Sequence, residues 1–114
     1  MRLRSSLAAA PGGLMLAVAL PSSPASAATG DFVYTYVGLN SVHLRGELAN
    51  PASAECINIP ETVGPALPAF APRNYTNSTA TVFLDEDCNG DTYYVMPPGK
   101  RLGDRLRLRS VVFS

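Results

Sequence analysis

The sequence contains no tryptophan, one histidine (His43) and only two cysteines among its 114 residues. No Gly-x-Ser-x-Gly elbow, HExxH pair or phosphate-binding loop accompanies this single imidazole, so the common catalytic motifs are missing. We therefore expect a protein that is not an enzyme. Nine Lys plus Arg balance nine Asp plus Glu. Because such a balance cannot neutralise many phosphates, we also expect no nucleic-acid binding.

Long hydrophobic runs are missing as well. The apolar stretch at residues 14–20 has seven residues, whereas a membrane-spanning helix needs about 20. It follows two arginines near the N-terminus and precedes the Ala-Ser-Ala of residues 25–27, which is the arrangement of a secretory signal peptide. We predict that residues 1–27 are this signal and that 87 of the 114 residues remain as the secreted, extracellular protein, residues 28–114. No stable membrane insertion is expected after cleavage.

The predicted export determines how two cysteines and two asparagines are interpreted. Cys56 and Cys88 both lie in the mature part, and an even number of thiols in an oxidising compartment predicts a disulfide. Metal ligation is the alternative, but two Cys and one distant His do not have zinc-type spacing. The bridge would restrict the unfolded chain by roughly 3–4 kcal/mol, which matters for a small core. Asn74 and Asn77 begin glycosylation sequons, which have a role only in a glycosylating secretory pathway.

The mature chain has the pattern of short β-strands. β-branched and aromatic residues alternate with polar ones, Gly and Pro interrupt the pattern repeatedly, and no stretch keeps helical spacing for three turns. The sequence predicts a single all-β domain over residues 28–114, built as a sandwich or barrel. The expected strands cover residues 32–37, 42–48, 56–59, 79–84, 92–96 and 106–113.

One segment does not fit a strand. Residues 60–72 (PETVGPALPAFAP) contain four prolines, which cannot donate to a sheet ladder and stiffen the backbone. We expect a long crossover loop between a first half, residues 30–59, and a second half, residues 73–114. The alternative is a proline-rich ligand for an aromatic groove.

The second half carries a specific motif. Phe83 is followed, after four intervening residues, by Cys88, a spacer and Gly90, and Ser110 comes twenty residues later. Residues 81–114 therefore resemble the Greek-key motif of the βγ-crystallin superfamily, and the chain resembles its small secreted bacterial members. The resemblance implies a two-motif Greek-key sandwich with one disulfide. In it Phe83 packs over a folded hairpin, Gly90 takes a positive φ, which glycine tolerates, and the Ser110 hydroxyl ties the hairpin back.

The first half matches this motif more loosely. Tyr36 and Gly38 would be its aromatic residue and glycine, and Ser78 or Thr79 its tying hydroxyl. In the second half Cys88 stands where the family usually has an aromatic residue. We interpret this as a replacement, in which the bond to Cys56 holds the hairpin in place of a packed ring.

Calcium-binding members of the family gather oxygen ligands from a stretch that begins with Asp or Asn. Residues 105–110 occupy these positions in the second half, where guanidinium groups would repel a divalent cation. Residues 74–79 occupy them in the first half and offer no carboxylate. Asp85, Asp87 and Asp91 form a separate, weak calcium candidate. A solvated turn that caps its own backbone is the favoured interpretation, so we expect no cofactor and at most weak calcium binding.

Basic residues gather near the C-terminus. Arg105, Arg107 and Arg109 alternate with leucines, so in one strand their guanidinium groups would share a face. Such a strip could bind an anionic partner, for example in a cell wall. Pairing with the acidic turn across the hairpin is the favoured use, and each such pair would contribute about 0.2–1 kcal/mol.

The resemblance also implies a class of function. Small disulfide-linked proteins similar to this one include a secreted metalloproteinase inhibitor and antimicrobial, killer-toxin-like proteins. It implies a binding or inhibitory module. We expect a monomer whose partner is a protein or a cell-wall component. The stiff loop, with Pro65, Ala66, Leu67 and Pro68, is the candidate contact, because a preorganised loop loses little entropy on binding. The alternative is a structural or cell-surface-associated βγ-crystallin-like protein with weak or no calcium binding.

Overall fold

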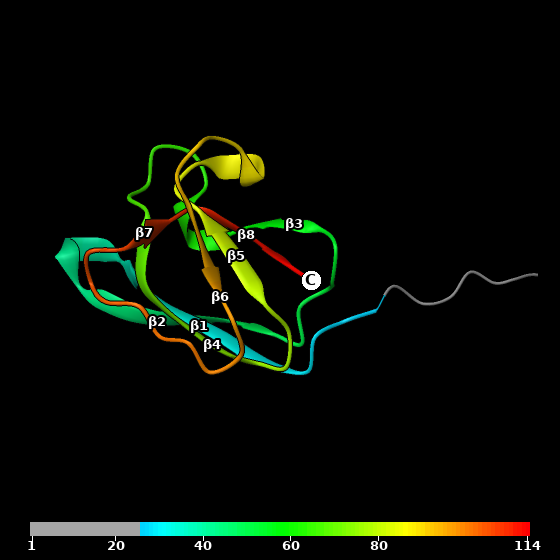
Figure 1. Ribbon diagram of the computed structural model, residues 1–114. Helices are drawn as coiled ribbons and strands as arrows, with labels where there is room; N and C mark the ends of the chain where they lie inside the picture. Colours follow the sequence, from blue (N-terminus) through cyan, green and yellow to red (C-terminus); the bar gives the residue numbers. More distant parts are fainter. Residues whose placement is uncertain (1–25) are drawn as a thin grey trace, which may run out of the picture.

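The computed structural model describes residues 26–114, which form two four-stranded antiparallel sheets with a core between them (Figure 1). The predicted all-β class is confirmed. The first sheet has the order β2-β1-β4-β7 and the second the order β3-β8-β5-β6. The strands are β1 (Gly30–Val37), β2 (His43–Ala49), β3 (Cys56–Asn58), β4 (Ala69–Thr76), β5 (Ala80–Phe83), β6 (Tyr93–Met96), β7 (Arg107–Leu108) and β8 (Ser110–Phe113).

Three short 3₁₀ turns interrupt the connections: η1 (Leu39–Ser41), η2 (Pro60–Thr62) and η3 (Glu86–Cys88). Within the described part of the chain, no helical segment has the length and hydrophobicity needed to cross a membrane. The predicted signal peptide lies outside the described residues except for Ser26 and Ala27.

The two sheets are related by an internal repeat. The strands β1, β2, β3 and β4 of the first half correspond to β5, β6, β7 and β8 of the second half. When each strand is replaced by its counterpart, the order β2-β1-β4-β7 becomes β6-β5-β8-β3, which is the order of the second sheet read from its other end. Each half of the chain therefore keeps three strands together and contributes its third strand, β3 or β7, to the opposite sheet. Because of this exchange, neither sheet is complete without both halves.

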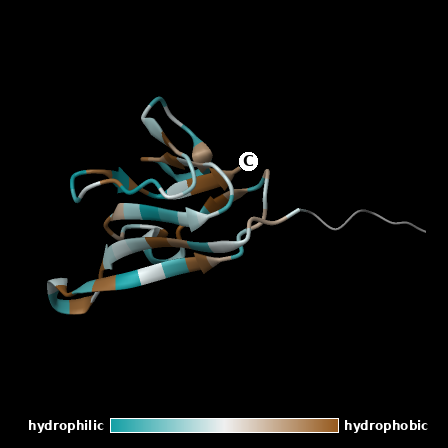
Figure 2. Ribbon diagram, turned by 60° about the horizontal axis from the view of Figure 1, so that its bottom comes forward, coloured by the Kyte–Doolittle hydropathy of each residue, from teal (hydrophilic) through white to brown (hydrophobic). Residues whose placement is uncertain are grey.

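The core lies between the sheets and follows the alternation of side chains along the strands. Phe32 and Tyr34 of β1 point inward, and the Phe32 ring meets the Phe113 ring of β8 edge to face at 5.4 Å between centroids. Figure 2 shows hydrophobic and hydrophilic residues alternating along the long strands. Val33 is also fully buried but lies outside the core cluster, because it belongs to the outer face of β1. Its cross-strand neighbours there are Glu47 and Arg73, whose long aliphatic stems can cover it.

The proline-rich crossover is shorter than predicted. β4 already begins at Ala69, so the expectation of loop up to residue 72 was wrong, and this strand was missed. Pro72 is accommodated because β4 bulges against β1: Val33 pairs with Arg73 and Thr35 with Phe70, which leaves Ala71 and Pro72 opposite one residue. Ala71 has a φ of 52°. At a bulge the missing N–H of proline removes no ladder hydrogen bond.

The C-terminal run was predicted as one strand and is two. β7 pairs with β4 in the first sheet, whereas β8 pairs with β3 and β5 in the second. Arg109 lies at the crossing, where its N–H donates to the Phe83 carbonyl and its own carbonyl accepts from Ile59 N–H. Period-two alternation continues through this crossing, so the pattern alone could not reveal that the chain changes sheets.

Candidate functional site

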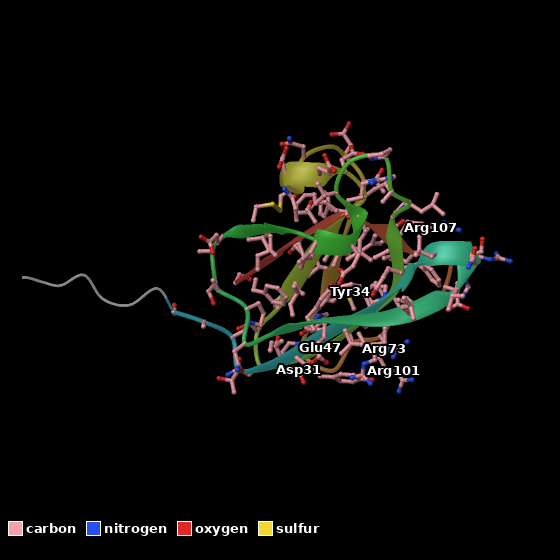
Figure 3. The ribbon with its side chains drawn as sticks, turned by 180° about the vertical axis from the view of Figure 1, so that it is seen from behind. Asp31, Tyr34, Glu47, Arg73, Arg101 and Arg107 are labelled. Carbon is pink, nitrogen blue, oxygen red and sulfur yellow. A yellow bond between two sulfur atoms is a disulfide. The ribbon has the colours of Figure 1, made fainter. Side chains whose placement is uncertain are left out.

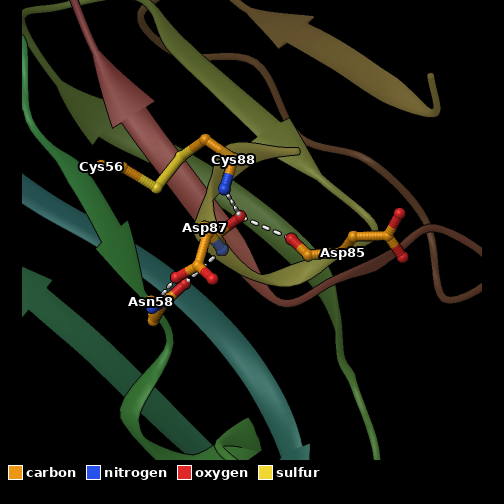
Figure 4. The surroundings of a disulfide bond; sticks show 6 residues. Cys56, Asn58, Asp85, Asp87 and Cys88 are labelled. Carbon is orange, nitrogen blue, oxygen red and sulfur yellow. Dashed lines mark hydrogen bonds between the residues drawn. A yellow bond between two sulfur atoms is a disulfide. The ribbon is translucent and has the colours of Figure 1, made fainter. Parts of the chain in front are cut away.

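The hairpin between β5 and β6 is fixed to β3 by the predicted disulfide, which is confirmed. Cys56 begins β3 and Cys88 ends η3, and their sulfurs are bonded at 2.06 Å (Figure 4). A reciprocal pair supports the bridge: Asn58 Nδ2 donates to Asp87 Oδ1 at 2.9 Å, and Asp87 N–H donates to Asn58 Oδ1 at 2.8 Å. The hairpin is therefore held to β3 both covalently and by hydrogen bonds.

Ser110 holds the same hairpin from the β8 side. Its hydroxyl donates to the Asp85 carbonyl at 2.6 Å and accepts from the Cys88 N–H at 2.8 Å. The residue is fully buried. One hydroxyl thus satisfies both the Cys88 N–H and the Asp85 carbonyl, two backbone groups of the turn that are not paired in a sheet ladder.

The turn itself depends on left-handed backbone. Asp87, Cys88 and Gly90 have φ values of 61°, 53° and 89°. The positive φ of Gly90 favours glycine, whereas a Cβ there would only require the exposed Asp85 carboxylate to move. The Phe83 ring packs against Tyr93 at 5.8 Å between centroids, which brings together the two strands that the hairpin joins.

The first half does not repeat these details. Gly38 has an ordinary φ of −91°, and the left-handed residues of the β1–β2 turn are instead Asn40 and Ser41. Ser78 contributes only its backbone: its carbonyl accepts from Asn74 Nδ2 and Thr76 Oγ1, far from that turn in the register of the sheet. Thr79, the other predicted hydroxyl, also contributes its carbonyl, which accepts from Ser114 N–H. The assignment of Gly38 and of Ser78 or Thr79 as the motif residues of the first half was therefore wrong. The β1–β2 hairpin is long and fully paired, so it needs no tying hydroxyl.

The loop from residue 60 to residue 68 is anchored at its base from three directions. Tyr34 of β1 donates its hydroxyl proton to Glu61 Oε1 at 2.7 Å. Arg109 Nη1 donates to the Thr62 carbonyl at 2.8 Å, and Gly64 N–H donates to Glu86 Oε2 of the hairpin at 3.3 Å. Burial, together with the hydrogen bond to Glu61, raises the pKa of Tyr34 well above the usual tyrosine range. The hydroxyl therefore remains a proton donor at all ordinary pH values.

Above this base the loop presents apolar side chains to solvent. Val63 and Leu67 are 60% and 59% exposed, Pro65 is exposed, and Ala66 and Pro68 are half-buried. The predicted contact residues 65–68 therefore lie together at the tip. Val63 was not predicted, because a single valine in a turn carries no periodic signal. The anchors were not predicted either, because they come from residues distant in the chain.

The predicted arginine strip is broken by the crossing between sheets. Arg109 turns inward to the loop, Arg107 lies over the Phe70 ring at 5.9 Å from its centroid, and Arg105 is exposed in a turn. The three do not share one face, and that prediction was wrong. Pairing with the acidic turn was wrong too: within residues 26–114 the single ion pair is Arg45–Glu47 at 3.8 Å, which is too exposed to contribute much.

A different set of arginines meets on the outer face of the first sheet. Arg73 and Arg101 are partners in an antiparallel bridge, so their side chains leave the same face, as Figure 3 shows. Like charges in directly opposed positions repel each other. Six of the seven basic residues after residue 27 belong to this sheet or to the segment that runs along β4: Arg45, Arg73, Lys100, Arg101, Arg105 and Arg107.

Most of the acidic residues lie outside the first sheet. Six of the nine acids lie in loops around the second sheet: Glu55, Glu61, Asp85, Glu86, Asp87 and Asp91. Among residues 26–114, no group of three or more His, Cys, Asp or Glu side chains is arranged to hold a metal ion. Asp87 and Glu86 are instead engaged with Asn58 and Gly64. Asn74 is buried and its amide is already bonded to the Ser78 and Met96 carbonyls.

The described surface also contains no pocket. Searches of protein-family models, of curated proteins and of solved structures found no match to this chain.

Proposed function

We propose that the protein is an exported, non-enzymatic binding or inhibitory module with a βγ-crystallin-like Greek-key architecture. The strand order supports the architecture, because two four-strand halves exchange their third strands between facing sheets. The Ser110 tie and the positive φ of Gly90 agree with the motif that the sequence resembles. The absence of a pocket in residues 26–114 agrees with binding through a protruding surface.

The observation that carries the proposal is the anchored loop at residues 60–68. Its base is bonded to β1, to Arg109 and to the β5–β6 hairpin, and the nearby disulfide closes that hairpin onto β3. Its tip exposes Val63 and Leu67 at about three fifths of their surface. A loop already held in one conformation loses little entropy when it enters a concave partner, and aliphatic side chains gain free energy there. A protease cleft is such a partner.

The test is inhibition of a panel of metalloproteases and serine proteases by the mature chain, residues 28–114. We expect inhibition at nanomolar concentration of at least one enzyme, and a loss of 10-fold or more on Leu67→Ser. The matched control is Leu39→Ser, which makes the same change at a leucine that is 89% exposed in the β1–β2 turn η1. No inhibition at high micromolar concentration, or equal losses in both variants, would remove the inhibitory function.

Export and metal dependence are tested separately. Expression in a secreting host with mass analysis of the medium should give a protein that begins at Ala28 with the disulfide formed. Calorimetry with and without millimolar calcium should give the same melting temperature. A rise in melting temperature that Asp87→Asn abolishes would instead favour a structural, calcium-stabilised protein.

A further inference from the structure

The free edge of the second sheet differs from the other three sheet ends. β2 carries exposed charges, β7 is only two residues long and carries Arg107, and β3 is short and fixed by the disulfide. β6, at the end of the order β3-β8-β5-β6, has no charged residue. Its consecutive residues Tyr93, Tyr94 and Val95 are 54%, 47% and 56% exposed. Uncharged, exposed edges of this kind invite pairing with another strand.

The register of β5 and β6 shows which backbone groups of that edge are unpaired. Leu84 N–H donates to the Thr92 carbonyl, which makes these two a hydrogen-bonded pair just beyond the strand ends. Bonded and non-bonded pairs alternate in an antiparallel ladder. Tyr94 and Met96 are therefore bonded to β5 through their pairing with Val82 and Ala80. The N–H and C=O groups of Tyr93 and Val95 consequently point away from the sheet.

We propose that two copies of this protein associate through β6, pairing antiparallel about a two-fold axis at Tyr94. Such an axis is perpendicular to the sheet, so residues that lie opposite each other must point to the same face. Because side chains alternate between the two faces along a strand, the numbers of opposed residues must differ by an even number. With the axis at Tyr94, Tyr93 lies opposite Val95 of the second copy, and the reverse pair forms on the other side of the axis. Both residues direct their backbone groups outward, so four hydrogen bonds form. The two sheets then become one continuous eight-stranded sheet.

Other symmetric registers are poorer. An axis at Val95 gives two hydrogen bonds and places Tyr93 opposite Pro97, which has no N–H. An axis at Tyr93 places Val95 opposite Asp91, which lies outside the strand. The favoured register also pairs an aromatic with a β-branched side chain on the outer face, a stabilising cross-strand combination.

The charges flanking β6 favour a second copy in this antiparallel orientation. The chain enters β6 from the acidic hairpin that ends with Asp91, and it leaves β6 toward Lys100 and Arg101. Antiparallel pairing brings the Asp91 end of β6 in each copy toward the other end of β6 in the second copy, next to which Lys100 and Arg101 lie against β4 of the facing sheet. A parallel arrangement would bring like charges together. The interface is small, below the ~1,200 Å² of stable complexes, so association should be weak and grow with concentration.

This edge lies outside the anchored loop, so the inference is independent of the proposed function, and it departs from the monomer that the sequence predicts. Sedimentation equilibrium of residues 28–114 up to about 1 mM should show dimers that decrease at high salt. Val95→Pro should abolish them, because it removes two of the four hydrogen bonds while leaving the β5 ladder intact. Val95→Thr is the matched control and should still dimerise. Val95→Lys provides a second disruption if the proline variant is unfolded by circular dichroism.

Cross-linking tests the register. Opposed residues of a non-bonded pair have Cα atoms about 4.5 Å apart, within reach of a disulfide. Under mild oxidation Tyr94→Cys should therefore form a covalent dimer at least 10-fold faster than Val95→Cys. The two thiols introduced by Val95→Cys would not lie opposite each other, because each is offset from the other by two residues along the paired strands. Faster cross-linking by Val95→Cys would overturn the register. A wild-type protein that stays monomeric at 1 mM, or dimers that persist in the folded Val95→Pro variant, would overturn the proposal.

Discussion

Ser110 offers the sharpest test of how the β5–β6 hairpin is held. Ser110→Ala removes one oxygen from a fully buried site and leaves the Asp85 carbonyl and the Cys88 N–H without their partner. An unsatisfied buried polar group costs about 1–3 kcal/mol. Asp85 is exposed and Cys88 half-buried, so water can replace part of the lost bonding. We expect a loss of about 2 kcal/mol in the free energy of unfolding, or about 8–16 °C in melting temperature for a domain of this size.

The assay is reversible denaturation in guanidinium chloride with the disulfide intact. Ser78→Ala is the matched control, because the Ser78 side chain makes no hydrogen bond among residues 26–114 and the residue is half-buried. It should change the free energy by less than about 0.5 kcal/mol. Equal midpoints and slopes for the two variants would refute the view that this hydroxyl stabilises the hairpin. A double variant that also lacks the disulfide should be non-additive, since both constraints act on one turn.

Three further variants test other parts of the framework. Replacing Cys56 and Cys88 by Ser should lower the free energy of unfolding by about 3–4 kcal/mol, and an unchanged denaturation midpoint would contradict this. Tyr34→Phe should cost about 1–2 kcal/mol near neutral pH. Because folding raises the pKa of Tyr34, the stabilisation by its hydroxyl is complete below pH ~10 and is lost as the pH rises through the folded-state pKa. The Tyr34→Phe variant should lack this loss of stability at alkaline pH. Identical profiles of stability against pH for the variant and the wild type would contradict the prediction. Asn74→Ala, which removes a buried amide with four hydrogen bonds, should cost about 2–4 kcal/mol, whereas thermal melts of the exposed Asn77→Ala should shift far less.

The residue patterns predicted much of the local structure because local structure depends on near neighbours in the chain. Alternation identified the strands at residues 32–37 and 92–96 to within two residues at each end. The predicted export and the even number of cysteines together predicted the disulfide, which needs no knowledge of the path between the two thiols. Alternation failed where tertiary pairing overrides it: Pro72 is tolerated only because β4 bulges opposite β1, and residues 106–113 keep their period while changing sheets.

The sequence by itself determined the all-β class, the single covalent bridge and the exposed-loop residues 65–68, because these follow from composition, spacing and the stiffness of proline. Only the tertiary structure decided which groups meet. It anchored the loop through Tyr34 and Arg109, placed Arg73 beside Arg101, and left β6 at an open edge. Each of these results depends on which strands become neighbours. The strands become neighbours in this order because both halves of the chain bury their apolar residues in one core and exchange their third strands between the sheets.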